Sequence, residues 1–177
     1  IILSIASLIT LSPLIVLVSL LIYLEDRGPI IFCQHRIGQN GRKFLFFKFR
    51  SMHVGTANLP SDKLGNSPIT RTGHFIRRYS IDEIPQLFNI IKGDMSIVGP
   101  RPALLNQEHL TKLRKENGSL SLKPGLTGLA QINSYNGMPE TVKANFDGKY
   151  LAELSALLDG KIVLLTLKYL TTPPPIY

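Results

Sequence analysis

The sequence predicts a mostly helical α+β fold with an apolar N-terminal segment that sits in a membrane. Residues 1–24 contain no Asp, Glu, Lys, Arg or His. Two short stretches rich in β-branched and aromatic residues follow on either side of a turn signal, and helical patterns separated by Gly and Pro come after them. The chain has 177 residues, 44% of them hydrophobic, which provides for a sizeable core and argues against disorder.

The uncharged run at residues 1–24 is long enough to cross a membrane. As one straight helix it would measure about 36 Å, against about 30 Å of hydrocarbon. It is too long for a secretory signal peptide, and no small-residue cleavage site follows it. Pro13 lies at its midpoint and predicts a kink, where the Ser12 hydroxyl can bond a freed backbone carbonyl. Either a kinked helix crosses the bilayer, or two half-helices enter and leave on one face.

The charge of the chain points to an anionic partner. Lys and Arg number 20 against 12 Asp and Glu, a net charge of +8, and no acidic residue occurs from Arg27 to Ser61. Basic residues beside an apolar segment favour the cytoplasmic side and attract anionic lipids. No stacking-aromatic motif or recognition helix supports nucleic-acid binding, which is not expected. A single cysteine, Cys33, rules out an intramolecular disulfide and a Cys-rich zinc site.

The elements after the apolar run are predicted from local patterns. Residues 30–34 and 44–49 form a hairpin around the turn signal at 38–41. A helix over 81–92 ends at Gly93. Further elements are expected as a helix within 102–117, a turn and then a strand within 123–133, and helix over 140–171 that breaks near Asp159-Gly160. The apolar stretch at 162–170 is too short to span a membrane and belongs either to the core or to the membrane interface.

The segment from Arg77 to Glu83 offers candidate chemistry. Ser80 and Glu83 match a Ser-x-x-Glu capping box, which would place Asp82 in the first helical turn. The helix dipole there, with Arg77 and Arg78 close in sequence, would favour an ionised carboxylate. Such an Asp can act as a nucleophile, and adjacent carboxylates suit Mg²⁺. A cap without chemistry explains Ser80 and Glu83 equally well.

A second candidate is Arg101, which stands between two prolines. Its restricted backbone suits bidentate phosphate binding, although an ordinary surface turn would look the same. The common phosphate-binding glycine motifs are missing from the sequence. Its four histidines lack metal-ligand spacing, so zinc is not expected.

Four motifs taken in order make the sequence resemble a known family. It is similar to the catalytic domain of the bacterial sugar transferases, the monotopic polyprenyl-phosphate phosphoglycosyl transferases. The motifs are Ser12-Pro13, Lys-Phe-Arg-Ser-Met at 48–52, the run from Asp-Glu-Ile-Pro-Gln to Gly-Pro-Arg-Pro at 82–102, and Lys-Pro-Gly-Leu-Thr-Gly-Leu-Ala-Gln at 123–131. Leu129 departs from the pattern, because many relatives carry Trp there.

The resemblance implies an architecture and a location. Residues 1–24 would be a re-entrant membrane helix broken at Ser12-Pro13, and residues 25–177 a catalytic domain on the cytoplasmic face of the bacterial inner membrane. Amphipathic helices would lie at the membrane interface. The partners would be a UDP-sugar donor, a polyprenyl (undecaprenyl) phosphate acceptor and membrane lipids, with a homo-oligomer left open. Neither the sugar nor the glycan pathway follows from the sequence.

The resemblance also implies a reaction and its residues. A phosphosugar would pass from the UDP-sugar to the polyprenyl phosphate, giving polyprenyl-diphosphate-sugar and UMP. Asp82 would be the nucleophile of a two-step reaction through a covalent intermediate, with Glu83 sharing in catalysis and in Mg²⁺ binding. The basic residues expected to contact substrate phosphates are Lys48, Arg50, Arg78 and Arg101.

Two alternatives to this two-step enzyme stay open. In the first, the sugar phosphate passes directly to the acceptor in a ternary complex, and Asp82 and Glu83 serve only Mg²⁺. In the second, the chain is a non-catalytic membrane-anchored module that binds lipid headgroups or a partner protein. Loss of Asp82 or Glu83 would then cost no more than a helix cap, about 1 kcal/mol.

Overall fold

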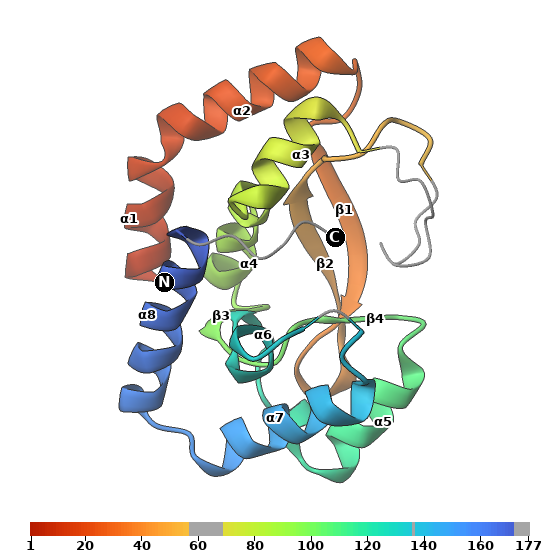
Figure 1. Ribbon diagram of the computed structural model, residues 1–177, viewed down its shortest axis with the longest axis vertical. Coiled ribbons are helices and arrows are strands. Elements are labelled where there is room, and N and C mark those ends of the chain that lie inside the picture. Colours follow the sequence, from red (N-terminus) through yellow and green to blue (C-terminus); the bar gives the residue numbers. More distant parts are fainter. Residues whose placement is uncertain (57–68, 136, 172–177) are drawn as a thin grey trace.

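A computed structural model describes residues 1–56, 69–135 and 137–171, the last three without their side chains. Two N-terminal helices, α1 (Ile2–Thr10) and α2 (Ser12–Glu25), border the molecule on one side (Figure 1). We call them the helix pair. Helices α3 (Arg71–Arg78) and α4 (Gln86–Lys92) lie between the helix pair and a central β-hairpin. The mixture of helices and short strands confirms the predicted α+β class.

The helix pair is bent where the sequence predicts a kink. Its two helices meet at an angle of 61°. The Ser12 hydroxyl donates to the Ile9 carbonyl at 2.7 Å, so it satisfies a carbonyl next to the break, as expected. Within the described ranges, no unbroken helix meets the length and hydropathy needed to cross a bilayer, whereas the bent pair meets them jointly.

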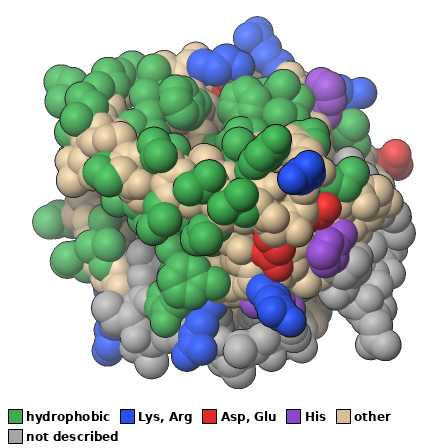
Figure 2. Space-filling view, turned by 90° about the horizontal axis from the view of Figure 1, so that it is seen from above, with side chains coloured by type: hydrophobic (Ala, Val, Ile, Leu, Met, Phe, Trp, Pro, Cys, Tyr) green, Lys and Arg blue, Asp and Glu red, His purple; other side chains and the backbone are tan. Residues whose placement is uncertain are grey.

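One side of the helix pair packs on the rest of the chain and the other is exposed. Val18 and Ile22 are buried against Phe49 of the hairpin and Ile76 of α3. Figure 2 shows the molecule from above, looking down onto α2, and many hydrophobic side chains gather on this surface. The exposed apolar residues of α2 are Val16, Leu17, Leu20, Leu21, Tyr23 and Leu24. A helix that is apolar all round but packed on one side leaves a surface unsuited to water.

The predicted hairpin is present. Strand β1 (Ile31–Ile37) pairs antiparallel with β2 (Lys43–Phe49) through the short 3-10 turn η1 (Gln39–Gly41). The first strand extends three residues further than predicted, to Ile37. On its other edge β1 pairs with β4 (Ala103–Leu104), so the sheet order is β2-β1-β4. Phe44 and Phe46 project from one face of β2 into a core that includes Leu87 and Ile90 of α4.

The predicted helix over 81–92 is interrupted, and the capping box is wrong. Residues Ile81–Glu83 form a 3-10 turn, η3, and α4 begins only at Gln86 after Pro85. Ser80 has the left-handed φ of 53°, and its side chain makes no capping bond. A capping residue needs an extended backbone to direct its hydroxyl at the following N–H groups, and Ser80 does not have one. The predicted stop at Gly93 is confirmed, with a φ of 84°.

A small parallel sheet joins the third and fourth sequence motifs. Strand β3 (Ser96–Val98) pairs with β5 (Gly125–Thr127). A Cβ atom on Gly125 or Gly128 would collide with the backbone of Gly99, so only glycine permits this approach. The strand therefore comes earlier than predicted within 123–133, and the apolar residues after it form the short helix α6 (Leu129–Ile132).

The C-terminal half is helical with a different break from the predicted one. Helix α5 (Glu108–Glu116) starts later than expected because residues 103–104 join the sheet, and the 3-10 turn η4 (Ser119–Ser121) follows it. Helices α7 (Glu140–Ala152) and α8 (Ala156–Thr171) separate at residues 153–155, not at Asp159-Gly160. Ser155 accepts a bond from Leu158 N at 3.3 Å and caps α8, which puts Asp159 in its favourable first turn.

Part of the apolar stretch at 162–170 belongs to the core, and a place at the membrane interface stays a prediction for its exposed part. Ile162 is fully buried beside Val98 and Tyr150, so this part of α8 belongs to the core. Leu164 and Leu167 are 69% and 54% exposed. Helix α8 thus has one packed side and one exposed apolar side.

Candidate active site

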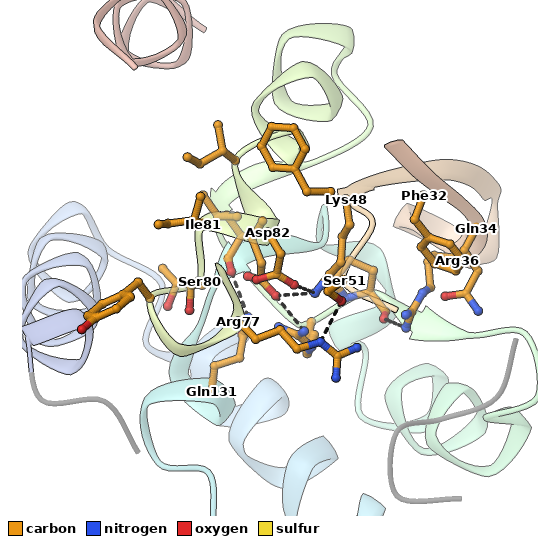
Figure 3. A pocket seen from close by; sticks show the side chains of 18 of the residues that line it. Phe32, Gln34, Arg36, Lys48, Ser51, Arg77, Ser80, Ile81, Asp82 and Gln131 are labelled. Carbon is orange, nitrogen blue, oxygen red and sulfur yellow. Dashed lines mark hydrogen bonds and ion pairs between the residues drawn. The ribbon is translucent and has the colours of Figure 1, made fainter. Parts of the chain in front are cut away.

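A cleft of about 1840 Å³ is lined by the hairpin, by η3 and by neighbouring helices, α6 among them (Figure 3). We call it the cleft. Its residues come from β1, β2, η3, the Arg101 segment and α6, and the cleft reaches Ser7, Leu11 and Leu14 of the helix pair. Segments that are distant in the sequence therefore meet around one space. A large concave site with a few charged groups is the usual form of a ligand site.

Two carboxylates and two cations form the centre of the cleft. Lys48 Nζ lies 3.2 Å from Asp82 Oδ2 and 2.9 Å from Glu83 Oε1. Arg101 Nη2 lies 2.9 Å from the same Glu83 oxygen. The Asp82 side chain is only 8% exposed, whereas that of Arg101 is 50% exposed. The structure thus brings together four of the residues expected from the sequence: Lys48, Asp82, Glu83 and Arg101.

The hairpin and the turn η3 position this cluster. Lys48 follows Phe44 and Phe46 on one face of β2, so the same alternation that buries two phenylalanines directs the lysine into the cleft. The Asn89 side chain holds β2 in place: its amide oxygen accepts from Phe47 N at 3.2 Å, and its amide nitrogen donates to Leu45 O at 2.7 Å. Asn89 is completely buried.

The two carboxylates have opposite pKa shifts. Burial raises the pKa of Asp82, the Glu83 charge raises it further, and Lys48 opposes them. Burial also acts on Glu83, but Lys48 and Arg101 outweigh it and lower the Glu83 pKa to about 2. Glu83 is therefore a fixed anion with two cations on one oxygen. Asp82 is the less stabilised carboxylate, and unequal pairs of this kind are typical of catalytic sites.

Of the two neighbouring arginines at the end of α3, Arg77 lies on the side of Asp82. Its Nε donates to Ser51 Oγ at 2.8 Å, and its charge opposes the rise of the Asp82 pKa. Arg78, which was expected to contact phosphate, borders the cleft but is exposed, with its guanidinium carbon 5.8 Å from the Tyr79 ring centroid. Consecutive helical residues point about 100° apart, so the two side chains leave α3 in different directions, and a phosphate contact for Arg78 stays a prediction.

Arg50 lies away from the carboxylate pair. Its guanidinium donates to the Asp26 carbonyl, and one nitrogen lies 3.9 Å from Asp26 Oδ2. The Asp26 carboxylate also accepts from Val54 N at 2.8 Å. Glu25 accepts from the first two N–H groups of α3, at Arg71 (2.6 Å) and Thr72 (2.8 Å). These contacts tie the end of α2 to the rest of the chain, and a phosphate contact for Arg50 stays a prediction.

Arg101 is supported from behind by a buried ion pair. Arg114 Nη1 donates to the Arg101 carbonyl at 2.9 Å, while Arg114 Nη2 lies 2.8 Å from Asp147 Oδ2. The side chains of Arg114 and Asp147 are 6% and 2% exposed. On the N-terminal side of Arg101, the backbone of Gly99 packs closely against the β5 segment and so holds the same stretch of chain. The fourth sequence motif therefore positions the third.

The donor set at the centre fits Mg²⁺. In the part of the chain that the structure describes, no three His, Cys, Asp or Glu residues gather at one point. Mg²⁺ needs no such cage, because it commonly takes one or two carboxylates and completes its coordination with substrate phosphates and water. Asp82 and Glu83, adjacent and turned toward one cleft, match that requirement.

Sequence reasoning missed Arg36 and Gln131 as cleft residues (Figure 3). Arg36 Nη1 donates to the Pro102 carbonyl at 3.2 Å, and Gln131 donates to the Leu126 carbonyl at 3.2 Å. For Arg36, the two-residue alternation of a strand provided a signal: Arg36 lies on the same face of β1 as Gln34, and both side chains line the cleft. Gln131 was missed because its segment was predicted as a strand, whereas it lies in helix α6.

Comparisons with known proteins show what this chain is similar to. The family model described as "Bacterial sugar transferase" matches residues 1–173. A galactosyl transferase, CpsE, of Streptococcus agalactiae is 45% identical over 81% of this chain and 35% of its own. An undecaprenyl-phosphate glucose phosphotransferase of Komagataeibacter xylinus is 40% identical, over 93% of this chain and 34% of its own.

A UDP-glucose:undecaprenyl-phosphate glucose-1-phosphate transferase of Caulobacter vibrioides is 38% identical, over 94% of this chain and 66% of its own. The chain spans about a third of the length of the first two relatives. The family model nevertheless covers almost every residue, including all four motifs, three of which contribute residues to the cleft. The chain belongs to the bacterial sugar transferase family.

Proposed function

We propose that this chain transfers a sugar phosphate from a UDP-sugar to a polyprenyl phosphate, giving polyprenyl-diphosphate-sugar and UMP. The observation that carries the proposal is the pair of buried Asp82 and half-buried Glu83, bound by Lys48 and Arg101 in a cleft that extends to an apolar helix pair. The relatives named for glucose phosphate transfer to undecaprenyl phosphate support the same reaction class.

In the first step an Asp82 carboxylate oxygen attacks the sugar-bearing phosphorus of the donor. The bond between that phosphorus and the bridging oxygen breaks, and UMP leaves with the electron pair. Asp82 then carries the phosphosugar as an acyl phosphate. In the second step an oxygen of the lipid phosphate attacks the same phosphorus, and the Asp82 carboxylate is released. The covalent intermediate splits one transfer into two displacements.

The electrostatics of the pair suit this division of roles. Asp82 is the less stabilised anion because burial and Glu83 both raise its pKa. Glu83 stays ionised and keeps Lys48 and Arg101 in place. An incoming diphosphate competes for the Lys48 ammonium and so frees the Asp82 oxygen for attack. Mg²⁺ bound to Asp82, Glu83 and the donor phosphates would offset the charge on the departing UMP.

The helix pair accounts for access to a lipid acceptor. In our proposal residues 1–24 form a re-entrant segment in the cytoplasmic leaflet of the bacterial inner membrane, and residues 25–177 stand on the cytoplasmic face. The bend of 61°, the exposed apolar side of α2 and the exposed leucines of α8 support this arrangement. Because Ser7, Leu11 and Leu14 line the cleft, a lipid phosphate at headgroup depth could reach it.

The test measures UMP release by the protein in detergent or lipid, with Mg²⁺, undecaprenyl phosphate and a panel of UDP-sugars. Asp82→Asn should abolish release while the variant still partitions into membranes. Asp94→Asn makes the same change of charge outside the cleft residues and should retain activity. Full activity of Asp82→Asn would refute the assignment of the nucleophile.

The two-step mechanism has its own readout. Without acceptor, the wild type should release UMP once per active site and retain the labelled phosphosugar. Release that requires undecaprenyl phosphate would instead indicate direct transfer, with Asp82 and Glu83 serving only Mg²⁺. Folded protein that releases no UMP with any donor would favour a non-catalytic, membrane-anchored module.

A further inference from the structure

Arg36 is a cation of the cleft that the proposed reaction does not yet use. It shares one face of β1 with Phe32 and Gln34, and Lys48 of β2 lies on the same face of the hairpin, which borders the cleft (Figure 3). Its guanidinium is held in place on two sides. One nitrogen donates to the Pro102 carbonyl at 3.2 Å, and the guanidinium carbon lies 5.1 Å from the centroid of the Phe46 ring. A cation so constrained is preorganised to bind a ligand.

The charge of Arg36 has no carboxylate of its own. Among the described residues it forms no ion pair, and its buried Nε has no hydrogen-bond partner there. Burial and the neighbouring Arg101 charge lower the pKa of Arg36 to about 10, so it stays protonated at neutral pH. Glu83 is the carboxylate that attracts it, and Glu83 already binds Lys48 and Arg101. Two guanidinium groups therefore share one carboxylate.

The cations divide into two groups around the two carboxylates. Lys48 and Arg77 act on Asp82, whereas the charges that act on Arg36 are Arg101 and Glu83. Four cations thus lie around two carboxylates, and Lys48 contacts both of them, at 3.2 Å from Asp82 Oδ2 and 2.9 Å from Glu83 Oε1. The excess positive charge matches a substrate with two phosphate groups. One phosphate would lie beside Asp82 and the other beside Arg101 and Arg36.

We propose that Arg36 and Arg101 form a second phosphate subsite, which binds the phosphate group that Asp82 does not attack. The proposal rests on the proposed function and adds a residue to it. A guanidinium pair can bind one phosphate through several oxygens at once, and the anion also removes the repulsion between the two cations. Two sources share this chemistry: the nucleotide phosphate that leaves as UMP, and the phosphate of the lipid acceptor.

The test compares Arg36→Gln and Arg36→Lys with the wild type in direct binding of UMP by calorimetry and in the KM for undecaprenyl phosphate. Loss of one charge-assisted contact should weaken the affected ligand about 10- to 100-fold in Arg36→Gln. Arg36→Lys keeps the charge but not the planar fork, so its loss should be smaller. Arg42→Gln, on the exposed hairpin turn outside the cleft, is the matched control and should bind both ligands normally.

The two measurements distinguish the two possible sources of the bound phosphate. Weaker UMP binding assigns the subsite to the nucleotide phosphate, and a higher KM for undecaprenyl phosphate assigns it to the acceptor. Normal values for both ligands in folded Arg36→Gln would overturn the subsite. A merely structural role would lower the melting temperature without changing either the UMP affinity or the KM for undecaprenyl phosphate. Arg36→Lys tests the proposal if the Gln variant does not fold. UMP binding needs no turnover, so failure of the subsite is distinguishable from failure of the proposed reaction.

Discussion

Removing one partner of the ion pair between Arg114 and Asp147 should strongly destabilise the region near Arg101. Two nitrogens of the Arg114 guanidinium lie 2.8 Å from Asp147 Oδ2, and both side chains are more than nine-tenths buried. Asp147→Ala would leave a buried, unpaired guanidinium, a change that costs about 3–5 kcal/mol. For a chain of this size that corresponds to a melting temperature lower by roughly 6–20 °C.

Exposed pairs provide the comparison. Lys112 and Glu116 are 75% and 58% exposed with their charges 3.9 Å apart, so Glu116→Ala should cost about 0.5 kcal/mol or less. The double variant Arg114→Met/Asp147→Leu removes both buried charges and should recover most of the lost stability. It cannot recover the bond from Arg114 to the Arg101 carbonyl, so UMP release should stay below that of the wild type.

The assay is thermal unfolding followed by circular dichroism in one detergent, with UMP release measured on the same samples. A loss in Asp147→Ala within 1 kcal/mol of that in Glu116→Ala would refute the reasoning on burial. Wild-type turnover in the double variant would refute the link to Arg101. The two readouts thus test the stability of the pair and its positioning role separately.

Two further predictions concern Asn89, which holds strand β2, and Glu83 in the centre of the cleft. Asn89→Leu keeps the side-chain size but leaves Phe47 N and Leu45 O without partners, so the free energy of unfolding should fall by about 2–5 kcal/mol, and an unchanged denaturation midpoint would contradict this. Burial raises the pKa of Glu83, but Lys48 and Arg101 outweigh it and lower this pKa from 4.5 to about 2. The ionised form of Glu83 therefore stabilises the fold above about pH 4.5, and this stabilisation is lost as the pH falls toward 2. The advantage of the wild type over Glu83→Gln in thermal unfolding should therefore shrink as the pH falls through this range, whereas a difference independent of pH would count against the ion pairs.

The elements that local rules determine were predictable from the sequence. The break at Ser12-Pro13 follows from the missing proline N–H, and the hairpin follows from its turn residues and its β-branched and aromatic strands. The stop at Gly93 is equally local, because it needs only a residue that tolerates a positive φ. Lys48, Asp82, Glu83 and Arg101 were selected through motifs, and the structure brings all four together.

The errors arise where distant parts of the chain decide. Ser80 matches a capping box in sequence, but η3 has to turn Asp82 and Glu83 toward Lys48, and the backbone at Ser80 becomes left-handed. The direction in which Arg77 leaves α3 depends on how that helix packs, which no local pattern reveals, whereas the phosphate contact of Arg78 stays a prediction. The position of the break before α8 depends on its cap at Ser155, not on the Asp-Gly pair to which the composition pointed.

The bonds of Asn89 also affect how the protein meets other chains. Strand β2 is the outer strand of its sheet, and such a strand offers unpaired N–H and C=O groups to any extended segment nearby. Asn89 occupies one of each, at Phe47 and Leu45, from a fully buried position. A side chain inside the same molecule thus closes part of the edge to strand addition. Without these two bonds, neighbouring copies would be more exposed to edge-to-edge aggregation along this strand.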